Sequence, residues 1–185
     1  EDDNTFLASL AEGGFQVEAL ARLSYPGGHF IDAPYGAYQK AYNQTLELLK
    51  LEEVVIYEAA FLYDGLFVMT DILVKKGNQV RLIEVKAKSF DSTQANTFIG
   101  SRGDIRSGWR PYLFDIAFQK YVAKKCVPHL HFDSFFLMAD KSKVATIDGL
   151  NQMFRLPVDG DIRKDVEVKI SAAEAQKTSV LSEVN

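Results

Sequence analysis

Three acidic residues of this chain could meet in one row across a small β-sheet, and a row of carboxylates is a place where metal chemistry can occur. Glu58, Asp71 and Glu84 lie on three consecutive predicted strands. Like charges directly opposite each other in a sheet are destabilising, so the row needs a compensating partner. Mg²⁺ or Mn²⁺ is the usual partner, because hard oxygen ligands suit both cations. Lys86 lies two residues beyond Glu84 on the same face of its strand and could supply a fixed positive charge for phosphate chemistry.

Two turn dipeptides set the register of this row. An Asp-Gly pair at 64–65 and a Gly-Asn pair at 77–78 separate three strand-like runs. If each pair forms a two-residue hairpin loop, the numbers of the paired residues have a constant sum. The first turn then places Glu58 opposite Asp71, and the second turn places Asp71 opposite Glu84.

The chemistry that such a row supports is hydrolysis at phosphorus. Asp71 and Glu84 offer the one or two carboxylates that Mg²⁺ needs beside water and substrate phosphate, and the main-chain carbonyl of Val85 lies next to them. A bound metal lowers the pKa of its water and offsets the charge that grows on the leaving oxygen. On an exposed strand, however, Glu-x-Lys is usually a solvated ion pair worth under about 1 kcal/mol. The short motif therefore has two interpretations, and the register of three acids favours the metal site.

The elements that must position this row are predicted from the spacing of apolar residues. They are helices over residues 5–23 (with a break at Gly13-Gly14), 37–50 and 111–125, and strands over 54–63, 66–75, 79–88, 129–139 and 153–158. Residues 89–108 form a long polar loop, which is typical of a functional segment. This order predicts an α/β fold with a mixed central sheet flanked by helices.

Length and composition limit the classes of protein that fit. A chain of 185 residues is long enough for one domain, which we expect over residues 1–158, followed by a helical tail over 159–185 that packs on this domain or extends from it. No apolar run is long enough to span a bilayer, so no membrane partner is expected. The single cysteine, Cys126, excludes an internal disulfide and fits a reducing, cytoplasmic location.

Positive charge is concentrated in one block. The net charge is −4, yet residues 75–125 carry 11 basic and 4 acidic residues. A positive patch beside a carboxylate row suits an enzyme that acts on a nucleic-acid backbone. A basic loop and a solvated helix face explain the same composition equally well. The candidate DNA contacts in the block are Lys88, Arg102, Arg106, Arg110 and Lys120.

Two motifs carry a resemblance to a known family. Asp71, followed by the run Glu-Val-Lys at 84–86, resembles the D…(D/E)xK signature of the PD-(D/E)XK nuclease superfamily, and the predicted order of elements resembles its αβββαβ core. The run DIAFQKY at 115–121 is similar to a second motif of RecB-like exonuclease domains, in particular of an uncharacterised bacterial family related to the CRISPR adaptation nucleases. The similarity covers about residues 12–158.

The resemblance implies roles for individual residues. It implies metal ligation by Asp71 and Glu84 and a catalytic role for Lys86. RecB-like domains carry Gly-x-x-x-His on an early helix, and in this chain Glu18 stands where that metal-binding histidine would be. A carboxylate can still bind a hard cation, so Glu18 is a further candidate ligand.

Three residues are expected to support this set. Gln119 matches the glutamine of a Gln-x-x-x-Tyr motif, while Tyr121 lies two positions beyond it rather than four. Glu58 is expected to act as a ligand, as a second layer behind the ligands, or as an inward acid bonded to backbone.

We therefore expect a Mg²⁺- or Mn²⁺-dependent nuclease that hydrolyses phosphodiester bonds of single- or double-stranded DNA. The alternative is a catalytically weak or inactive module of the same fold that binds nucleic acid or assembles with a larger DNA-processing enzyme. A third interpretation is an α/β scaffold that binds no metal.

Overall fold

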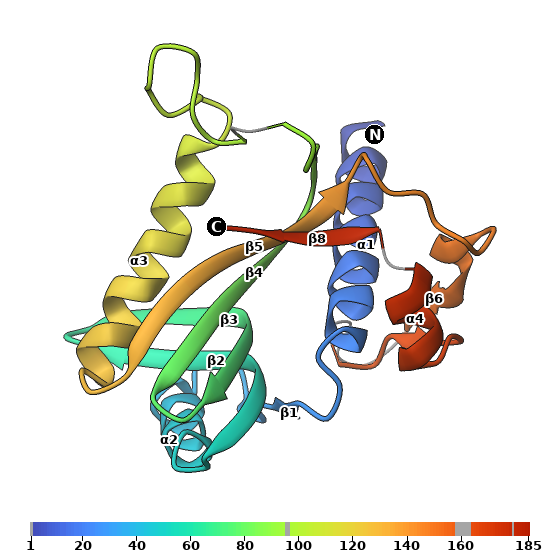
Figure 1. The fold of residues 1–185 in the computed structure, drawn as a ribbon. Coiled ribbons are helices and arrows are strands. Elements are labelled where there is room, and N and C mark those ends of the chain that lie inside the picture. The colour runs from blue at the N-terminus through green and yellow to red at the C-terminus, as the bar shows by residue number, and fades with distance from the viewer. Residues whose placement is uncertain (1, 95–96, 158–163, 179) are drawn as a thin grey trace.

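The protein is an α/β structure built on one mixed, six-stranded sheet (Figure 1). This computed structural model describes residues 2–94, 97–157, 164–178 and 180–185, and for residues 2–12, 151 and 178 it describes the backbone alone. The strand order in the sheet is β1-β2-β3-β4-β5-β8, and β6 and β7 form a separate two-stranded sheet. The predicted fold class, a mixed central sheet with helices, is confirmed at this level.

The elements follow one another along the chain with these bounds. They are α1 (Asp2–Leu23), β1 (His29–Phe30), α2 (Tyr38–Leu48), β2 (Glu53–Tyr63), β3 (Leu66–Lys76), β4 (Gln79–Phe90), α3 (Arg110–Cys126), β5 (His131–Asp140), a 3₁₀ turn η1 (Leu150–Met153), β6 (Phe154–Arg155), β7 (Glu167–Val168), α4 (Ala172–Thr178) and β8 (Leu181–Val184).

The register of the β2–β3–β4 meander is the one that its turns predict. Tyr57 pairs with Ile72 across the first hairpin, and Ile72 pairs with Ile83 across the second. Both turns carry a glycine with positive φ, 78° at Gly65 and 56° at Gly77, as tight hairpin loops require. Strand β5 then returns parallel to β4, with α3 as the crossover. The later strand therefore lies beside the meander, as expected for a helical connection.

The sheet is covered on both faces. Leu82 of β4 packs in a core with residues of α2 and α3, while its neighbour Ile83 packs in a core with residues of α1. Figure 1 shows α1 and α3 on opposite sides of β4 and β5. Because successive side chains of a strand point to opposite faces, one strand serves both cores.

Two predicted features of the helices and the tail are wrong. Helix α1 runs without a break through Gly13-Gly14, because the burial of Ala19, Leu20 and Ala21 against the sheet outweighs the cost of about 1 kcal/mol for each helical glycine.

The tail is not simply helical, since it supplies β8, which pairs antiparallel with β5 at the edge of the central sheet. Tyr25 and Arg81 both bond to Glu183 and hold β8 to the rest of the fold. The strand expected over 153–158 is shorter than predicted, because only Phe154–Arg155 form β6, Met153 ends the 3₁₀ turn and residues 156 and 157 are not in a strand. The domain boundary expected at residue 158 lies outside the described residues.

Candidate functional site

Strands β3 and β4 separate at Asp71, and a side chain takes the place of the backbone ladder there. The last β3–β4 backbone pair is Ile72 with Ile83, so Asp71 and Glu84 are aligned by register but do not form a backbone pair. Instead, Oδ2 of Asp71 accepts a hydrogen bond of 2.7 Å from the backbone N–H of Val85. This bond fixes the carboxyl group of Asp71 beside the Glu84-Val85-Lys86 run.

Glu84 is buried and its two carboxylate oxygens have different partners. Its side chain comes from the centre of the sheet, and the residue is 6% exposed. Oε1 lies 2.6 Å from Nζ of Lys86, and Oε2 accepts a hydrogen bond of 2.9 Å from Nε2 of Gln119 on α3. Nζ of Lys86 also lies 3.7 Å from Oδ2 of Asp115. Helix α3 therefore helps to orient both the acid and the lysine of the motif.

Glu58 interrupts strand β2 opposite Asp71. The β2–β3 pairing passes from Tyr57 directly to Ala59, and the φ angle of Glu58 is 60°. A non-glycine residue in the left-handed region costs of order 1–3 kcal/mol and needs surrounding structure to hold it. Glu58 lies opposite Asp71 in the register, as predicted. Because the backbone of Glu58 is left-handed, the two residues do not form a regular backbone pair.

Several negative charges act on the carboxyl group of Asp71. Burial raises the pKa of Asp71 well above its ordinary value, Glu84 raises it further, and the Val85 N–H bond opposes them only in part. Glu18 and Glu58 add to the same upward shift. The structure thus brings the four predicted acids into one electrostatic cluster, with Glu18 contributed by α1. We call Glu18, Glu58, Asp71 and Glu84 the carboxylate cluster.

Two cations face the carboxylate cluster. Burial, the largest single influence, lowers the pKa of Lys86, but the charge and hydrogen bond of Glu84 together with the charges of Asp71 and Asp115 outweigh it, so the net shift is upward. The second cation is Arg22 of α1, whose Nη1 lies 3.8 Å from Oε2 of Glu18. Burial lowers the pKa of Arg22, and the negative charges of Glu18, Glu58 and Asp71 oppose this shift. Arg22 was not expected from the sequence, although its spacing of four residues from Glu18 on one helix was the available signal.

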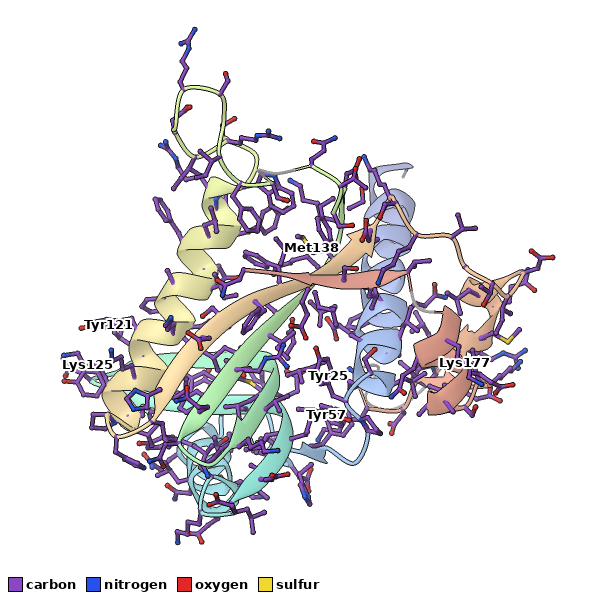
Figure 2. The ribbon with its side chains drawn as sticks, viewed as in Figure 1. Tyr25, Tyr57, Tyr121, Lys125, Met138 and Lys177 are labelled. Carbon is purple, nitrogen blue, oxygen red and sulfur yellow. The ribbon has the colours of Figure 1, made fainter. Side chains whose placement is uncertain are left out.

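The two other supporting residues have different positions. Gln119 is 6% exposed and binds Glu84, while its Oε1 has no hydrogen-bond partner among the described residues. Tyr121 is not brought to the carboxylate cluster. Its ring is exposed on the outer side of α3, where Lys125 lies 5.6 Å from the ring centroid (Figure 2). The helical turn that points Gln119 inward points Tyr121 outward.

The predicted DNA contacts spread from the site along the loop before α3. Nζ of Lys88 donates to the carbonyl of Gly108 and lies 4.3 Å from the ring centroid of Trp109. Nε of Arg106 donates to the carbonyl of Ile99 within the loop. The side chains of Arg102 and Arg110 are exposed, and that of Lys120 on α3 is half-buried. Lys86 and Lys88 share one aromatic neighbour, because their Nζ atoms lie 5.7 and 4.9 Å from the ring centroid of Tyr112.

The donor set fits a hard cation with few protein ligands. Among the described residues, no group of three or more His, Cys, Asp or Glu side chains is gathered tightly enough to enclose a metal. Mg²⁺ needs less than this, because it is usually held by one or two carboxylates with water and substrate phosphate. A cluster that raises the pKa of Asp71 has excess negative charge, which a divalent cation offsets. Asp71, Glu84 and the carbonyl of Val85 are the groups that could hold it.

No family model, no curated protein and no solved structure matches this chain. No described helix combines the length and the apolar character that crossing a membrane requires. The chemistry of the site is therefore the basis for assigning a function.

Proposed function

We propose that this protein is a metal-dependent nuclease of the PD-(D/E)XK, RecB-like type, which hydrolyses phosphodiester bonds of DNA with Mg²⁺ or Mn²⁺. The proposal includes the αβββαβ core of that superfamily. A cytoplasmic location and assembly with a larger DNA-processing enzyme stay predictions.

One observation carries the proposal. A partly buried aspartate, Asp71, is anchored by the Val85 N–H and has its pKa raised by burial and by the other acids of the carboxylate cluster. Such an arrangement is unfavourable for stability, and strongly perturbed carboxyl groups cluster at functional sites. The neighbouring lysine, Lys86, makes the combination specific to chemistry on an anionic substrate.

The residues of the site would divide the work as follows. Asp71, Glu84 and the carbonyl of Val85 would hold the cation, whose role is to lower the pKa of the attacking water and to offset charge on the leaving oxygen. Lys86 would hold its positive charge beside the phosphate as negative charge grows on the phosphoryl oxygens. Gln119 would keep Glu84 in position through the bond of 2.9 Å.

Nothing in this scheme asks Lys86 to lose its proton. Its pKa is shifted upward by Glu84, so it remains a cation at neutral pH. Substrate phosphate would compete with Glu84 for the lysine, which would free the Oε1 oxygen of Glu84 for the cation.

The direct test is cleavage of labelled single- and double-stranded DNA in the presence of Mn²⁺. The variants are Asp71→Asn and Lys86→Ala, each with a matched control that changes the same residue type outside the site. Asp64→Asn lies in the β2–β3 turn, and Lys76→Ala removes an exposed ion pair with Glu53. Activity that survives both site substitutions contradicts the assignment, whereas activity lost in the controls points to damage of the fold.

A non-catalytic role in nucleic-acid binding is the second candidate. The observation that favours it is the absence of a tight three-ligand group among the described residues, together with an ion pair that occupies both Lys86 and Glu84. This role predicts DNA binding that weakens with salt, needs no metal and is unchanged in Asp71→Asn. Calorimetric titration with Mn²⁺ separates the two candidates, because only the nuclease requires that Asp71 bind metal.

A further inference from the structure

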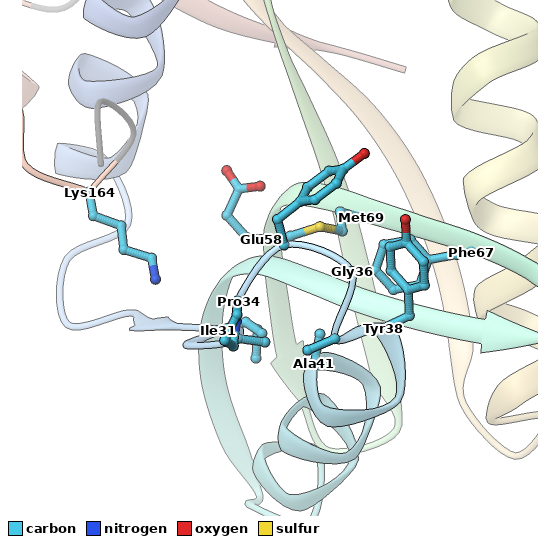
Figure 3. Close-up of a pocket in the computed structure, with 12 residues that line it drawn as sticks. Ile31, Pro34, Gly36, Tyr38, Ala41, Glu58, Phe67, Met69 and Lys164 are labelled. Atoms are coloured by element: carbon cyan, nitrogen blue, oxygen red, sulfur yellow. The ribbon is translucent and has the colours of Figure 1, made fainter. Parts of the chain in front are cut away.

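A cavity of about 290 Å³ lies next to the carboxylate cluster, between α2 and the β2–β3 hairpin (Figure 3). Its walls are largely apolar and aromatic. They include Tyr38 of α2 and Phe67 and Met69 of β3, and among the described residues Glu58 and Lys164 are the charged ones that line it. A volume of this size is at the small end of ligand pockets and suits one ring system rather than a helix or a duplex.

The cavity and the carboxylate cluster share one surface. Glu58 lines the cavity and also acts on the pKa of Asp71. Phe67, Met69 and Asp71 alternate along β3, so they lie on the same side of the strand, while the intervening Val68 and Thr70 are buried. Two residues of a strand span about 6.6 Å, so the cavity begins one side chain away from Asp71.

The rings of Tyr38 and Phe67 form an aromatic surface inside the cavity, which we call the ledge. The ring centroids of Tyr38 and Phe67 are 4.5 Å apart, with an angle of 44° between the planes. Phe67 packs against the main core, which fixes the ledge, whereas Tyr38 is 44% exposed. Tyr35, in the loop before α2, is fully exposed at the same cavity. Rings held open to solvent beside a charged site are suited to stacking on a planar ligand.

The charged groups at the cavity are of the kinds that hydrogen-bond to nucleobases. Figure 3 shows Glu58 and Lys164 on one side of the cavity and the rings of Tyr38 and Phe67 on the other. A carboxylate accepts from the exocyclic N–H groups of bases, and an ammonium donates to their ring nitrogens and carbonyls. Nζ of Lys164 lies 3.4 Å from Oδ1 of the exposed Asp32 at the rim of the cavity.

We propose that this cavity is a nucleobase subsite, which takes one unstacked base of single-stranded DNA beside the phosphodiester that a cation at Asp71 and Glu84 would hold. The placement of the phosphodiester rests on the proposed nuclease function, but the binding of the base does not require cleavage. A base inside a duplex is paired and stacked on both faces, so it can enter only if it leaves the stack. The subsite therefore gives a preference for single strands or frayed ends.

The test uses short single-stranded oligonucleotides with 2-aminopurine at successive positions, with EDTA present so that cleavage cannot consume the probe. In the wild-type protein, one probe position is expected to show a distinct fluorescence change when its base stacks on the ledge. An abasic residue at that position is expected to weaken binding by at least about fivefold, since stacking on an aromatic side chain contributes about 1–3 kcal/mol per base. This arm needs no protein variant.

Substitutions locate the effect on the ledge. Tyr38→Ala is expected to remove the position-specific signal and to weaken binding by at least about fivefold, and Tyr38→Phe is expected to retain both because it keeps the ring. Tyr63→Ala is the matched control, because Tyr63 is also a surface tyrosine, 38% exposed, but does not line the cavity.

The outcomes separate the two proposals. A signal that is uniform along the oligonucleotide, or equal affinities for Tyr38→Ala and Tyr63→Ala, overturns the subsite and leaves the cavity to another ligand, such as an apolar side chain of a peptide. DNA cleavage that persists unchanged in Tyr38→Ala at all substrate concentrations also overturns the subsite and leaves the nuclease intact. A position-specific signal in EDTA, combined with no DNA cleavage by the wild-type protein in Mn²⁺, supports the subsite and contradicts the nuclease.

Discussion

Asp71 and Asp140 are both substantially buried aspartates of the same sheet, and their surroundings affect them in opposite directions. Asp71 accepts one backbone hydrogen bond and faces other acids, and its pKa is raised. Asp140, 3% exposed at the end of β5, is also desolvated, but hydrogen bonds from Ser92 and Ser142 outweigh this and lower its pKa. The hydroxyl of Ser182 on β8 donates to its second oxygen over 3.0 Å.

This difference shows which of the two aspartate charges stabilises the fold. Hydrogen bonds that favour the ionised form make the charge of Asp140 a source of stability. Desolvation and like charges make the charge of Asp71 a cost, which a protein retains where a ligand or a reaction needs it. We therefore expect the fold to depend on Asp140 and the function to depend on Asp71, and the following predictions test that division.

The largest effect is expected for Asp71→Asn. DNA cleavage should fall by about 100-fold or more, because loss of a residue that merely supports a metal ligand already lowers metal affinity or activity by about 10–100-fold. The free energy of unfolding in EDTA, measured with urea, should stay equal or rise, because a buried like charge is removed while an oxygen remains to accept from Val85. A loss of more than about 1 kcal/mol in the free energy of unfolding would mean that the fold, and not only the function, depends on Asp71.

Asp140→Asn is expected to do the opposite. The free energy of unfolding at pH 7 should fall by about 1–2 kcal/mol, since hydrogen bonds to a charged group weaken, and cleavage by the folded protein should be unchanged. Because the folded pKa lies below the ordinary value of 3.8, the contribution of Asp140 is complete above that pH and is lost as the pH falls through the folded pKa.

Urea unfolding of wild type and Asp140→Asn from pH 7 down to pH 3 measures this dependence. The two stability curves should run parallel above about pH 5 and converge in acid. A difference that stays constant across the range would mean that the charge of Asp140 is not what stabilises the fold.

Gln119→Ala is expected to have an intermediate effect at the functional site. It removes the hydrogen bond that orients Glu84, so cleavage should fall by about tenfold and half-saturation with Mn²⁺ should need a higher concentration. Tyr121→Ala serves as the control, because Tyr121 is exposed two residues further along the same helix. Equal activity of the two variants would show that Gln119 has only a packing role.

The smallest effect is expected for Ser182→Ala. It removes one of the donors to Asp140 and should lower the free energy of unfolding by about 0.5–1.5 kcal/mol without affecting cleavage. The control is Ser107→Ala, in the loop before α3. Ser171→Ala is unsuitable, because the hydroxyl of Ser171 bonds to Glu174 and caps α4. An unchanged stability would mean that Asp140 is held by Ser92 and Ser142 alone.

Much of the meander could be predicted from the chain, because two-residue hairpin loops have few backbone solutions and each fixes a register. The two turns by themselves align Glu58, Asp71 and Glu84, and the strand pairing of the folded protein agrees with that alignment. The resemblance added Glu18 and Gln119, which the structure brings to the same cluster. These residues could be predicted because their positions depend on local turns and on helical spacing.

Other features could not be predicted in this way. The left-handed backbone of Glu58 carries no sequence mark, since glutamate has no preference for positive φ. Strand β8 forms only because the edge of β5 is open to it, and that edge is created by residues more than forty positions away. The role of Arg22 depends on α1 packing against β4, which its own helical pattern does not reveal.

The sequence by itself determined the α/β class, the hairpin register and the alignment of three acids, because these follow from turn geometry and from alternation along strands. Tertiary structure alone decided which of the buried acids is satisfied and which is not. Asp71 and Asp140 are the same residue type, and their pKa values diverge. Burial and the acids of β4, α1 and β2 act on Asp71, while the loops after β4 and β5 and strand β8 bring hydrogen-bond donors to Asp140. Electrostatic free energy depends on distances between groups far apart in the chain, and only the fold sets those distances.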